Sequence, residues 1–558
     1  MPSRDEHHGM SRSPVREECR IAIEWMRRHR LLSLILATGL ALRLAPILWG
    51  VPLTPHIRDY HPDESKVYGA LAGFPEIYGT MEPFPGYGTA VQYLVGVVLL
   101  PVKAVAVWIA ERPYAYRIVA QLAARMCSAL LGVGSILLTY LLGVRLFDRA
   151  EATTGAAFLA LSFFHAMNSA VGTLDVPLSF LLLVNLLVCF TAFEDPRPGP
   201  FLVAGVCAGL LVGTKLSGIV FLVVPAVMAL ASRSRRRAEE PRVRVASSVS
   251  LPRLLPLYAL GGLVAYGVTN PQVFLAFDDY VAWWAQEYAQ VHSRFVGSLV
   301  ELARRWIEQT RHAVGIPVAI LAPVGAALAG RTRRLEKRVL VLLVLVYYGV
   351  LSWSLIARYV ITVAPILCLF AARGAWVAVR RERPWSRAVG IVAVAIGVIT
   401  GLHACLAGTW LRWNDTRPAA ARFIVETVPA NATVGLAAAA EERSARTHRW
   451  QYPAVDFDRY RETAPLDRPE ILVFSSADYR KVLDTLSTGK LGPEYELPAE
   501  YAREWFRYVA PSPDAFRLYE DVLVREEGYH LLKAFRRRVT VPLEFPPPEI
   551  RIYGRNRP

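Results

Sequence analysis

Cysteine is scarce in this sequence, and none follows residue 405. The 558 residues contain six cysteines, at positions 19, 127, 189, 207, 368 and 405. The last five lie within long apolar segments, and no two cysteines form a CxxC pair. These absences exclude a disulfide scaffold in the polar segment after residue 405 and a zinc site of the paired-cysteine type.

Charged residues are also few, at 20% of the chain against 54% hydrophobic residues, with a mean hydropathy of +0.30. This composition predicts a polytopic membrane protein and excludes an ordinary soluble one. The net charge is +16, but the arginines cluster between apolar segments and do not form one basic surface. That pattern is the positive-inside distribution of membrane proteins and indicates that nucleic acid is not a partner.

The N-terminus lacks the short charged start followed directly by an apolar core that marks a cleaved leader. We therefore expect residues 1–30 to form a cytoplasmic segment that leads into an uncleaved signal anchor at 31–49. A transmembrane helix needs about 20 apolar residues. The basic residues just before position 31 favour a cytoplasmic N-terminus, in an inner (plasma) membrane protein with many spans.

The apolar segments predict a mainly α, polytopic helical bundle of about eleven spans over residues 31–411. They lie at 31–49, 89–110, 118–142, 152–170, 174–194, 200–231, 254–275, 313–329, 339–355, 357–379 and 387–411. Arginine-rich loops at 232–253, 331–338 and 380–387 are predicted to be cytoplasmic. Outer loops are then expected at 50–117 and 276–312.

Two topologies satisfy this charge distribution. In the first, residues 89–110 span the membrane and residues 200–231 form one long helix. In the second, 89–110 lies along the membrane face, and 200–231 is two short helices joined at Lys215. The second places Asp175 and Lys215 on the outer side with Asp63, and it satisfies the charge rule better, so we prefer it.

Residues 412–558 are more polar than the rest of the chain and contain short β-like segments such as 471–474, with a helical pattern near 417–427. This segment has the size of a single small domain. It is predicted to be an α/β domain, extracytoplasmic in both topologies.

Two neighbouring acids, Asp63 and Glu64, follow the first apolar segment closely. Carboxylates near hydrocarbon are costly unless they are solvated or functional. The functional interpretation is a general base, Asp63 with Glu64 beside it, that deprotonates an acceptor hydroxyl or amine at the membrane face. The ordinary explanation is a solvated loop. Asp175 begins an apolar segment, where it either caps a helix or serves as a second acid that orients the substrate.

Three cations are predicted on the same face as these acids: Arg125, Lys215 and Arg358. A phosphate at the membrane surface suits such groups, because guanidinium binds it in a bidentate manner. The ordinary explanation is that the side chains extend toward lipid headgroups.

No cofactor is certain from the sequence. Glu82 and His292 form one candidate pair for a divalent metal ion, although a metal site needs more ligands than these two.

Several short motifs together resemble the protein O-mannosyltransferase superfamily, which includes the lipid A aminoarabinose transferases. They are His61-Pro62-Asp63-Glu64, the segment 125–132, the segment around Asp175, Thr214-Lys215-Leu216-Ser217-Gly218, Ala357-Arg358-Tyr359 with Pro365, and Asn414-Asp415-Thr416-Arg417. The resemblance covers roughly residues 31–430. It implies a GT-C glycosyltransferase, similar to glycosyltransferase family 39, that uses polyprenyl-phosphate sugars.

The resemblance also implies an outward-facing active site, inversion at the anomeric carbon, Asp63 as the base and membrane-surface helices in the first loop. The chain departs from the family at Glu82-Pro83-Phe84-Pro85-Gly86-Tyr87, where the family often has Pro-Pro-Leu. In the family this loop meets substrate. The 276–312 loop of this chain shows no β-trefoil insertion, which argues against a eukaryotic-type protein mannosyltransferase. The resemblance further implies Glu82 as a substrate-binding acid of the site and His292 as a metal partner.

Three functions remain open at this stage. The first is an integral membrane glycosyltransferase for hexosyl or pentosyl transfer from a polyprenyl-phosphate-sugar donor to a lipid, glycan or protein acceptor. The second is a transporter or flippase for a lipid-linked glycan intermediate, which would suit an inverted repeat; the sequence shows none. The third is a membrane scaffold whose tail binds a partner, and binding by residues 412–558 alone would favour it.

Overall fold

The fold is described from a computed structural model of the whole chain. The residues described are 29–51, 60–61, 63–78, 88–194, 196–228, 251–292, 298–332, 334–351, 356–429, 432, 434–436, 470–475, 522–523, 525, 528–539, 541 and 549–556. Glu82 and the loop segment at which the chain departs from the family lie outside these residues. The side chain of His292 is likewise outside the description.

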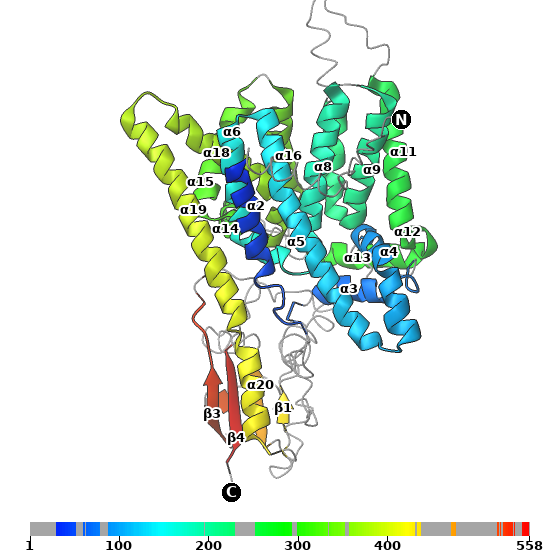
Figure 1. The fold of residues 1–558 in the computed structure, drawn as a ribbon, viewed down its shortest axis with the longest axis vertical. Helices are drawn as coiled ribbons and strands as arrows, with labels where there is room; N and C mark the ends of the chain where they lie inside the picture. The colour runs from blue at the N-terminus through cyan, green and yellow to red at the C-terminus, as the bar shows by residue number, and fades with distance from the viewer. Residues whose placement is uncertain are drawn as a thin grey trace, which may run out of the picture.

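The apolar segments fold into a bundle of long helices, as predicted (Figure 1). Its main helices are α2 (Arg30–Leu44), α5 (Pro113–Leu146), α6 (Arg149–Ala160), α8 (Asp175–Glu194), α9 (Pro198–Thr214), α11 (Leu251–Thr269), α15 (Ile316–Gly330), α16 (Leu335–Leu351), α18 (Ala364–Val379) and α19 (Pro384–Trp413). Helix α5 contacts α6 and α8, while α18 contacts α6, α15 and α19. The mainly α fold class is confirmed.

The bundle is that of a multi-pass membrane protein. Five helical stretches of the described residues are long and apolar enough to span a membrane: Ala90–Ile109, Pro113–Leu146, Asp175–Glu194, Ala357–Val379 and Pro384–Ile424. A sixth span results if α14 (Leu299–Val314) and α15, bent by 114° at Gly315, are counted together. Apolar side chains such as Val98, Leu263 and Ile399 are exposed on the outer faces, where lipid would cover them. The count of eleven spans stays a prediction.

The break predicted at Lys215 is present. Helix α9 ends at Thr214, Lys215 has an extended backbone with φ −157° and ψ 131°, and η2 (Leu216–Leu222) follows. Residues 89–110 form α4 (Ala90–Lys103) and the π-helical turn η1 (Ala104–Ile109). In Figure 1, α4 lies beside the lower half of α5, beyond the lower ends of α9 and α11. This arrangement favours the second topology, in which 89–110 lies along the membrane face.

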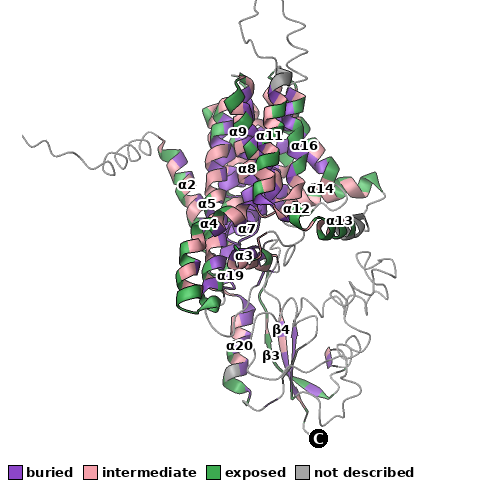
Figure 2. Cartoon of the chain, turned by 90° about the vertical axis from the view of Figure 1, so that its right-hand side faces the viewer, coloured by how far each residue is buried: buried purple, intermediate pink, exposed green. Residues whose placement is uncertain are grey.

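Short helices gather at the same end of the bundle. They are α3 (Glu64–Gly73), α7 (Phe163–Ser169), α12 (Gln272–Leu275), α13 (Phe277–His292), α17 (Ala357–Val360) and η4 (Ile361–Val363). Figure 2 shows the buried residues concentrated in the middle of the bundle, whereas the described side chains of α13, at 277–285, are largely exposed below α14. The predicted outer loop 276–312 is therefore mostly helical.

The C-terminal region contains α20 (Thr416–Thr427) and a small sheet, as predicted (Figure 1). The sheet order is β1 (Val434–Leu436), β2 (Ile471–Ser475), β4 (Ile550–Arg555) and β3 (Tyr529–Phe535). Strands β1 and β2 are parallel, and the other two pairings are antiparallel. Ile424 of α20 packs with Phe474 and Ile552 in a separate core, so this region has its own hydrophobic interior.

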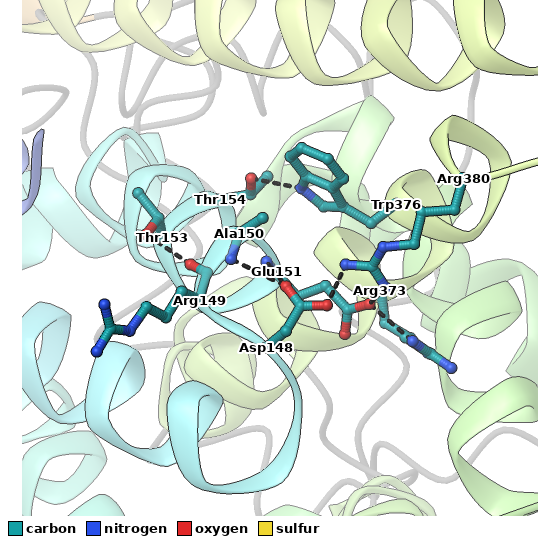
Figure 3. Close-up of polar contacts among 9 residues, drawn as sticks. All are labelled: Asp148, Arg149, Ala150, Glu151, Thr153, Thr154, Arg373, Trp376 and Arg380. Carbon is teal, nitrogen blue, oxygen red and sulfur yellow. Dashed lines mark hydrogen bonds and ion pairs between the residues drawn. The ribbon is translucent and has the colours of Figure 1, made fainter.

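An ion cluster joins α6 to α18 at the opposite end of the bundle (Figure 3). Glu151 has a fully buried side chain and accepts hydrogen bonds from Arg373 at 2.7 Å and from Arg380 at 2.6 Å. Asp148 caps α6 through the amides of residues 150 and 151, both at 2.9 Å, and also pairs with Arg380. A buried carboxylate is tolerated only with such partners, and the cluster therefore fixes this end of α6 against α18.

Replacing Gly325 with alanine is expected to destabilise the α15–α18 crossing. A Cβ at this position would lie 1.7 Å from the carbonyl oxygen of Phe370, which is main chain and cannot rotate away. Overpacking of this kind typically costs about 1–3 kcal/mol. Thermal unfolding of the purified protein should show a lower Tm for Gly325→Ala. Gly330→Ala is the control, because it lies on the same helix and a Cβ there would have nothing within 4 Å. Equal Tm values for both variants would contradict the close contact of Gly325 with α18.

Candidate active site

The two first-loop acids have different surroundings. Glu64 begins α3 and its side chain is fully buried. It accepts hydrogen bonds from Arg125 at 2.5 and 2.6 Å, from Gln121 at 3.2 Å and from the amide of Gly172 at 2.9 Å. Burial raises the pKa of Glu64, but the charge and hydrogen bonds of Arg125 outweigh burial and lower it. Both of its oxygens are thus occupied by the protein.

Arg125 has a structural setting that the sequence did not reveal. Its guanidinium is fully buried, and besides Glu64 it donates to the carbonyl oxygens of Ile47 at 2.5 Å and Trp49 at 2.7 Å. We predicted that Arg125 binds substrate phosphate and that Glu64 joins Asp63 in catalysis. In this structure both side chains are fully buried, and they hold the start of α3 against α5 and against the segment that follows α2. The two predicted roles stay predictions.

Asp63 is the more accessible acid, with 21% of its side chain exposed. Arg358 donates a short hydrogen bond to it, and Lys66 lies 3.9 Å away. Burial raises the pKa of Asp63, but the charges of Arg358, His61 and Lys66 and the hydrogen bond from Arg358 lower it to about 2. In this structure Asp63 is therefore an ionised carboxylate and a weak base.

Asp175 lies on the other side of Arg358. Its carboxylate accepts a hydrogen bond from Lys215 at 2.6 Å and lies 3.4 Å from the Nε of Arg358. Asp175 is the first residue of α8 and is almost completely buried. The ammonium of Lys215 also lies 4.7 Å from the ring centroid of Tyr359, a cation–π contact. Asp175 therefore has two cationic partners, in addition to its place at a helix N-terminus.

Asp63, Asp175, Lys215 and Arg358 thus form one charged quartet. They come from the start of α3, the start of α8, the α9–η2 break and α17, which are far apart in the sequence. Side-chain exposure ranges from 3% for Asp175 to 21% for Asp63, so the quartet is largely buried but still reached by solvent. The two carboxylates neutralise the charge of the two cations. An anion that enters the site would compete with these carboxylates for Lys215 and Arg358.

The predicted metal pair, Glu82 and His292, is not placed by the structure, because neither side chain is described. Among the described side chains, no three His, Cys, Asp or Glu residues cluster as metal ligands. Metal binding by these two residues stays a prediction, and so does substrate binding by Glu82.

The sequence assigned no role to several residues that make hydrogen bonds or cation–π contacts at the ends of the first loop or with Lys215. They are Trp49, Tyr60, Gln121, Gly172, Tyr359, Arg412, Asp415 and Arg417. The aromatic residues at both sides of 52–59 and the Asp415–Arg417 motif were visible in the sequence. Their partners were not, because the contacts join segments more than 300 residues apart.

A family comparison adds to this geometry. Residues 91–258 match the family described as dolichyl-phosphate-mannose-protein mannosyltransferase. The predicted resemblance is confirmed. The matched part includes Asp175 and Lys215, whereas Asp63 and Arg358 lie outside it. No curated protein matches the chain by sequence.

Solved structures of two proteins are also similar. The oligosaccharyltransferase from Archaeoglobus fulgidus, in complex with Zn and sulfate, has 12% identity and a TM-score of 0.48; the match covers 94% of this chain and 88% of that chain. ArnT from Cupriavidus metallidurans, bound to undecaprenyl phosphate, has 14% identity and a TM-score of 0.46; the match covers 82% of this chain and 94% of that chain.

Proposed function

We propose that this chain is an integral membrane glycosyltransferase. It moves a hexosyl or pentosyl unit from a polyprenyl-phosphate-linked donor to a lipid, glycan or protein acceptor at the outer membrane face. The charged quartet carries this proposal, because four separated segments bring two carboxylates and two cations together at one end of the bundle. The family match adds support, since its description names a polyprenyl-type phosphate sugar.

Lys215 and Arg358 are the residues that bind the donor phosphate in this proposal. Arginine suits phosphate because its planar fork matches two oxygens, and lysine contributes a compact charge. During transfer, negative charge grows on the phosphate oxygen that leaves the sugar. Cations fixed beside that oxygen stabilise the transition state more than the ground state.

Asp63 is the proposed general base, and the donor controls its basicity. Arg358 donates a hydrogen bond to Asp63, and the carboxylate is a weak base with a pKa of about 2. A bound phosphate competes for Arg358 and withdraws it from Asp63. Loss of a cationic partner raises a carboxylate pKa, so donor binding itself makes Asp63 a better base.

The reaction then proceeds as a single inverting displacement. The acceptor oxygen or nitrogen attacks the anomeric carbon, and the bond from this carbon to the phosphate oxygen breaks. The bonding electron pair stays on the phosphate oxygen, and Asp63 takes the acceptor proton. The products are the glycosylated acceptor and polyprenyl phosphate, whose added charge remains beside Lys215 and Arg358.

The orientation in the membrane is part of the same proposal. The N-terminal segment lies in the cytoplasm, and the C-terminal domain lies outside the inner (plasma) membrane. The contact of Lys215 with Asp175 and the bridge of Arg358 to Asp63 support the topology that groups these residues on one face. The arginine-rich loops at the opposite end then face the cytoplasm.

The pH dependence tests the control of Asp63 by the donor. Because Asp63 must be ionised to accept a proton, activity falls as pH drops through its pKa. The kcat/KM profile reports the free enzyme and kcat reports the substrate complex. We expect the acid limb of kcat to lie at higher pH than that of kcat/KM. Rates with a polyprenyl-phosphate sugar from about pH 4 to pH 8 check this. Across this range kcat should fall toward the acid end while kcat/KM stays level, because the pKa of about 2 in the free enzyme lies below the range. A kcat/KM that falls together with kcat would contradict the control of Asp63 by the donor.

A direct test of the activity compares the cell envelope with and without the gene. Mass spectrometry of envelope lipids, glycans and glycoproteins should show one sugar modification lost in the deletion strain and its unused polyprenyl-phosphate donor accumulated. An unchanged envelope and donor pool would contradict the transferase proposal.

A further inference from the structure

Two buried aromatic residues flank the start of the first loop. Trp49 follows α2 and Tyr60 precedes Asp63 by three residues, and their side chains are 6% and 3% exposed. The rings meet edge to face, with centroids 5.4 Å apart and planes at 68°. Gly50 has φ +70°, and a Cβ there would lie 2.6 Å from the ring of Tyr60. Only glycine fits both this backbone and this contact.

The junction between α19 and α20 holds this aromatic pair. Asp415 accepts a hydrogen bond from the indole of Trp49 at 3.0 Å and two from Arg417, at 2.9 and 2.7 Å. The guanidinium carbon of Arg417 lies 3.6 Å from the ring centroid of Tyr60. Both ions are more than nine-tenths buried, and burial strengthens such contacts because little water screens them.

Arg412 extends this cluster into the bundle. Its guanidinium lies 4.5 Å from the ring centroid of Trp49 and donates to the carbonyl oxygen of Met167 on α7 at 3.0 Å. We define the junction cluster as Trp49, Tyr60, Arg412, Asp415 and Arg417. These five residues fix the end of α19 and the start of α20 to the first loop.

The junction cluster and the Arg125–Glu64 pair hold the same short segment from two sides. Arg125 binds Glu64 and also the main-chain oxygen of Trp49 at 2.7 Å. Tyr60 and Glu64 are therefore both anchored, and Asp63 lies between them. A shift of about 1 Å in a reacting group can reduce a rate about a hundredfold, so this double anchoring bears directly on a base at position 63.

We propose that the Asp415–Arg417 pair is a positioning element for Asp63, an inference that rests on the proposed function. The pair contacts no reacting atom; it acts through Tyr60 and Trp49. Helix α20 also packs on the C-terminal sheet through Ala420 and Ile424. The C-terminal domain is thus connected through this pair to the segment that carries the base.

Four variants test this role. Arg417→Met removes the guanidinium, and Arg417→Lys keeps the charge but loses the fork. The double variant Asp415→Asn with Arg417→Met leaves no unpaired buried charge, which protects folding. Tyr60→Phe keeps the ring that contacts Arg417. The buried Tyr60 hydroxyl has no hydrogen-bond partner among the described residues, so we expect this variant to change exchange and kcat little. Arg422→Met, an exposed position on α20, is the matched control.

Hydrogen exchange of residues 60–73 and transfer kinetics are measured on the full-length protein in lipid nanodiscs. We expect Arg417→Met and the double variant to exchange faster in this segment and to lose roughly tenfold or more in kcat, with donor KM changed less than about threefold. Arg417→Lys should be intermediate. Tyr60→Phe and Arg422→Met should match the parent protein.

Two results would overturn the positioning role. One is exchange at 60–73 that is the same in Arg417→Met, the double variant and Arg422→Met. The other is faster exchange with unchanged kcat, which would mean that transfer does not depend on how this segment is held. Failure of the proposed function gives a different result, because the parent protein would then transfer no sugar, while exchange at 60–73 still reports the contact.

Discussion

Replacing Asp63 with asparagine should lower kcat for sugar transfer by roughly a hundredfold to ten-thousandfold, the usual range for loss of a general base. Asparagine has nearly the same shape and still accepts a hydrogen bond from Arg358, so the fold should be retained. Single-turnover rates with a polyprenyl-phosphate sugar, measured on purified protein in nanodiscs, check the prediction.

Binding of the lipid product provides a second measurement on the same variant. Asp63 competes with phosphate for Arg358 in our account. Asp63→Asn should therefore bind polyprenyl phosphate at least as tightly as the parent protein while it fails to transfer sugar. Lys66→Gln, which removes an exposed cation 3.9 Å from the same carboxylate, is the control and should stay near parental activity. Full transfer by Asp63→Asn would refute the assignment of the base.

Replacing Arg125 with methionine should destabilise the protein by about 3–5 kcal/mol, the cost of leaving one member of a buried ion pair alone. The carboxylate of Glu64 is fully buried and would keep only its bonds to Gln121 and Gly172. Unfolding of the purified protein, followed by heat or denaturant, measures the loss. Arg117→Met on the same helix, at an exposed position, should change stability little.

A double variant separates the ion pair from simple packing. Arg125→Met combined with Glu64→Leu removes both charges, and buried ion pairs replaced by apolar residues often regain stability. The double variant should therefore be more stable than Arg125→Met alone. With Glu64→Leu measured as well, the coupling is the loss in unfolding free energy of the double variant minus the sum of the two single losses. A coupling of zero would show that the two residues act independently.

The sequence predicted the quartet better than its surroundings. Asp63, Asp175 and Arg358 each stand at the edge of an apolar segment, and Lys215 interrupts one, where a charge is costly. Two topologies satisfied the charge rule, and the preferred one placed all four residues on one face. Arg125 looked the same in the sequence, but its partner Glu64 lies 61 residues away, and hydropathy contains no information about which side chains meet across a bundle.

Helix breaks show a similar limit. The apolar segment 152–170 reads as one span, but α6 ends at Ala160 and α7 begins at Phe163. Ser162 lies at the break, and its hydroxyl donates to the carbonyl oxygen of Ala313 at 2.9 Å. The residues on both sides of this break are buried in the bundle. The hydropathy of the segment therefore does not indicate where the helix ends. The break at Lys215 was predicted because a charged residue and two glycines interrupt its segment.

The most direct test of the central claim is complementation of a deletion strain of the source organism, followed by mass spectrometry of its envelope. The account predicts that the parent gene restores one sugar modification, that Lys66→Gln restores it equally, and that Asp63→Asn leaves the polyprenyl-phosphate sugar unused. Restoration of the modification by Asp63→Asn at parental levels would contradict the account.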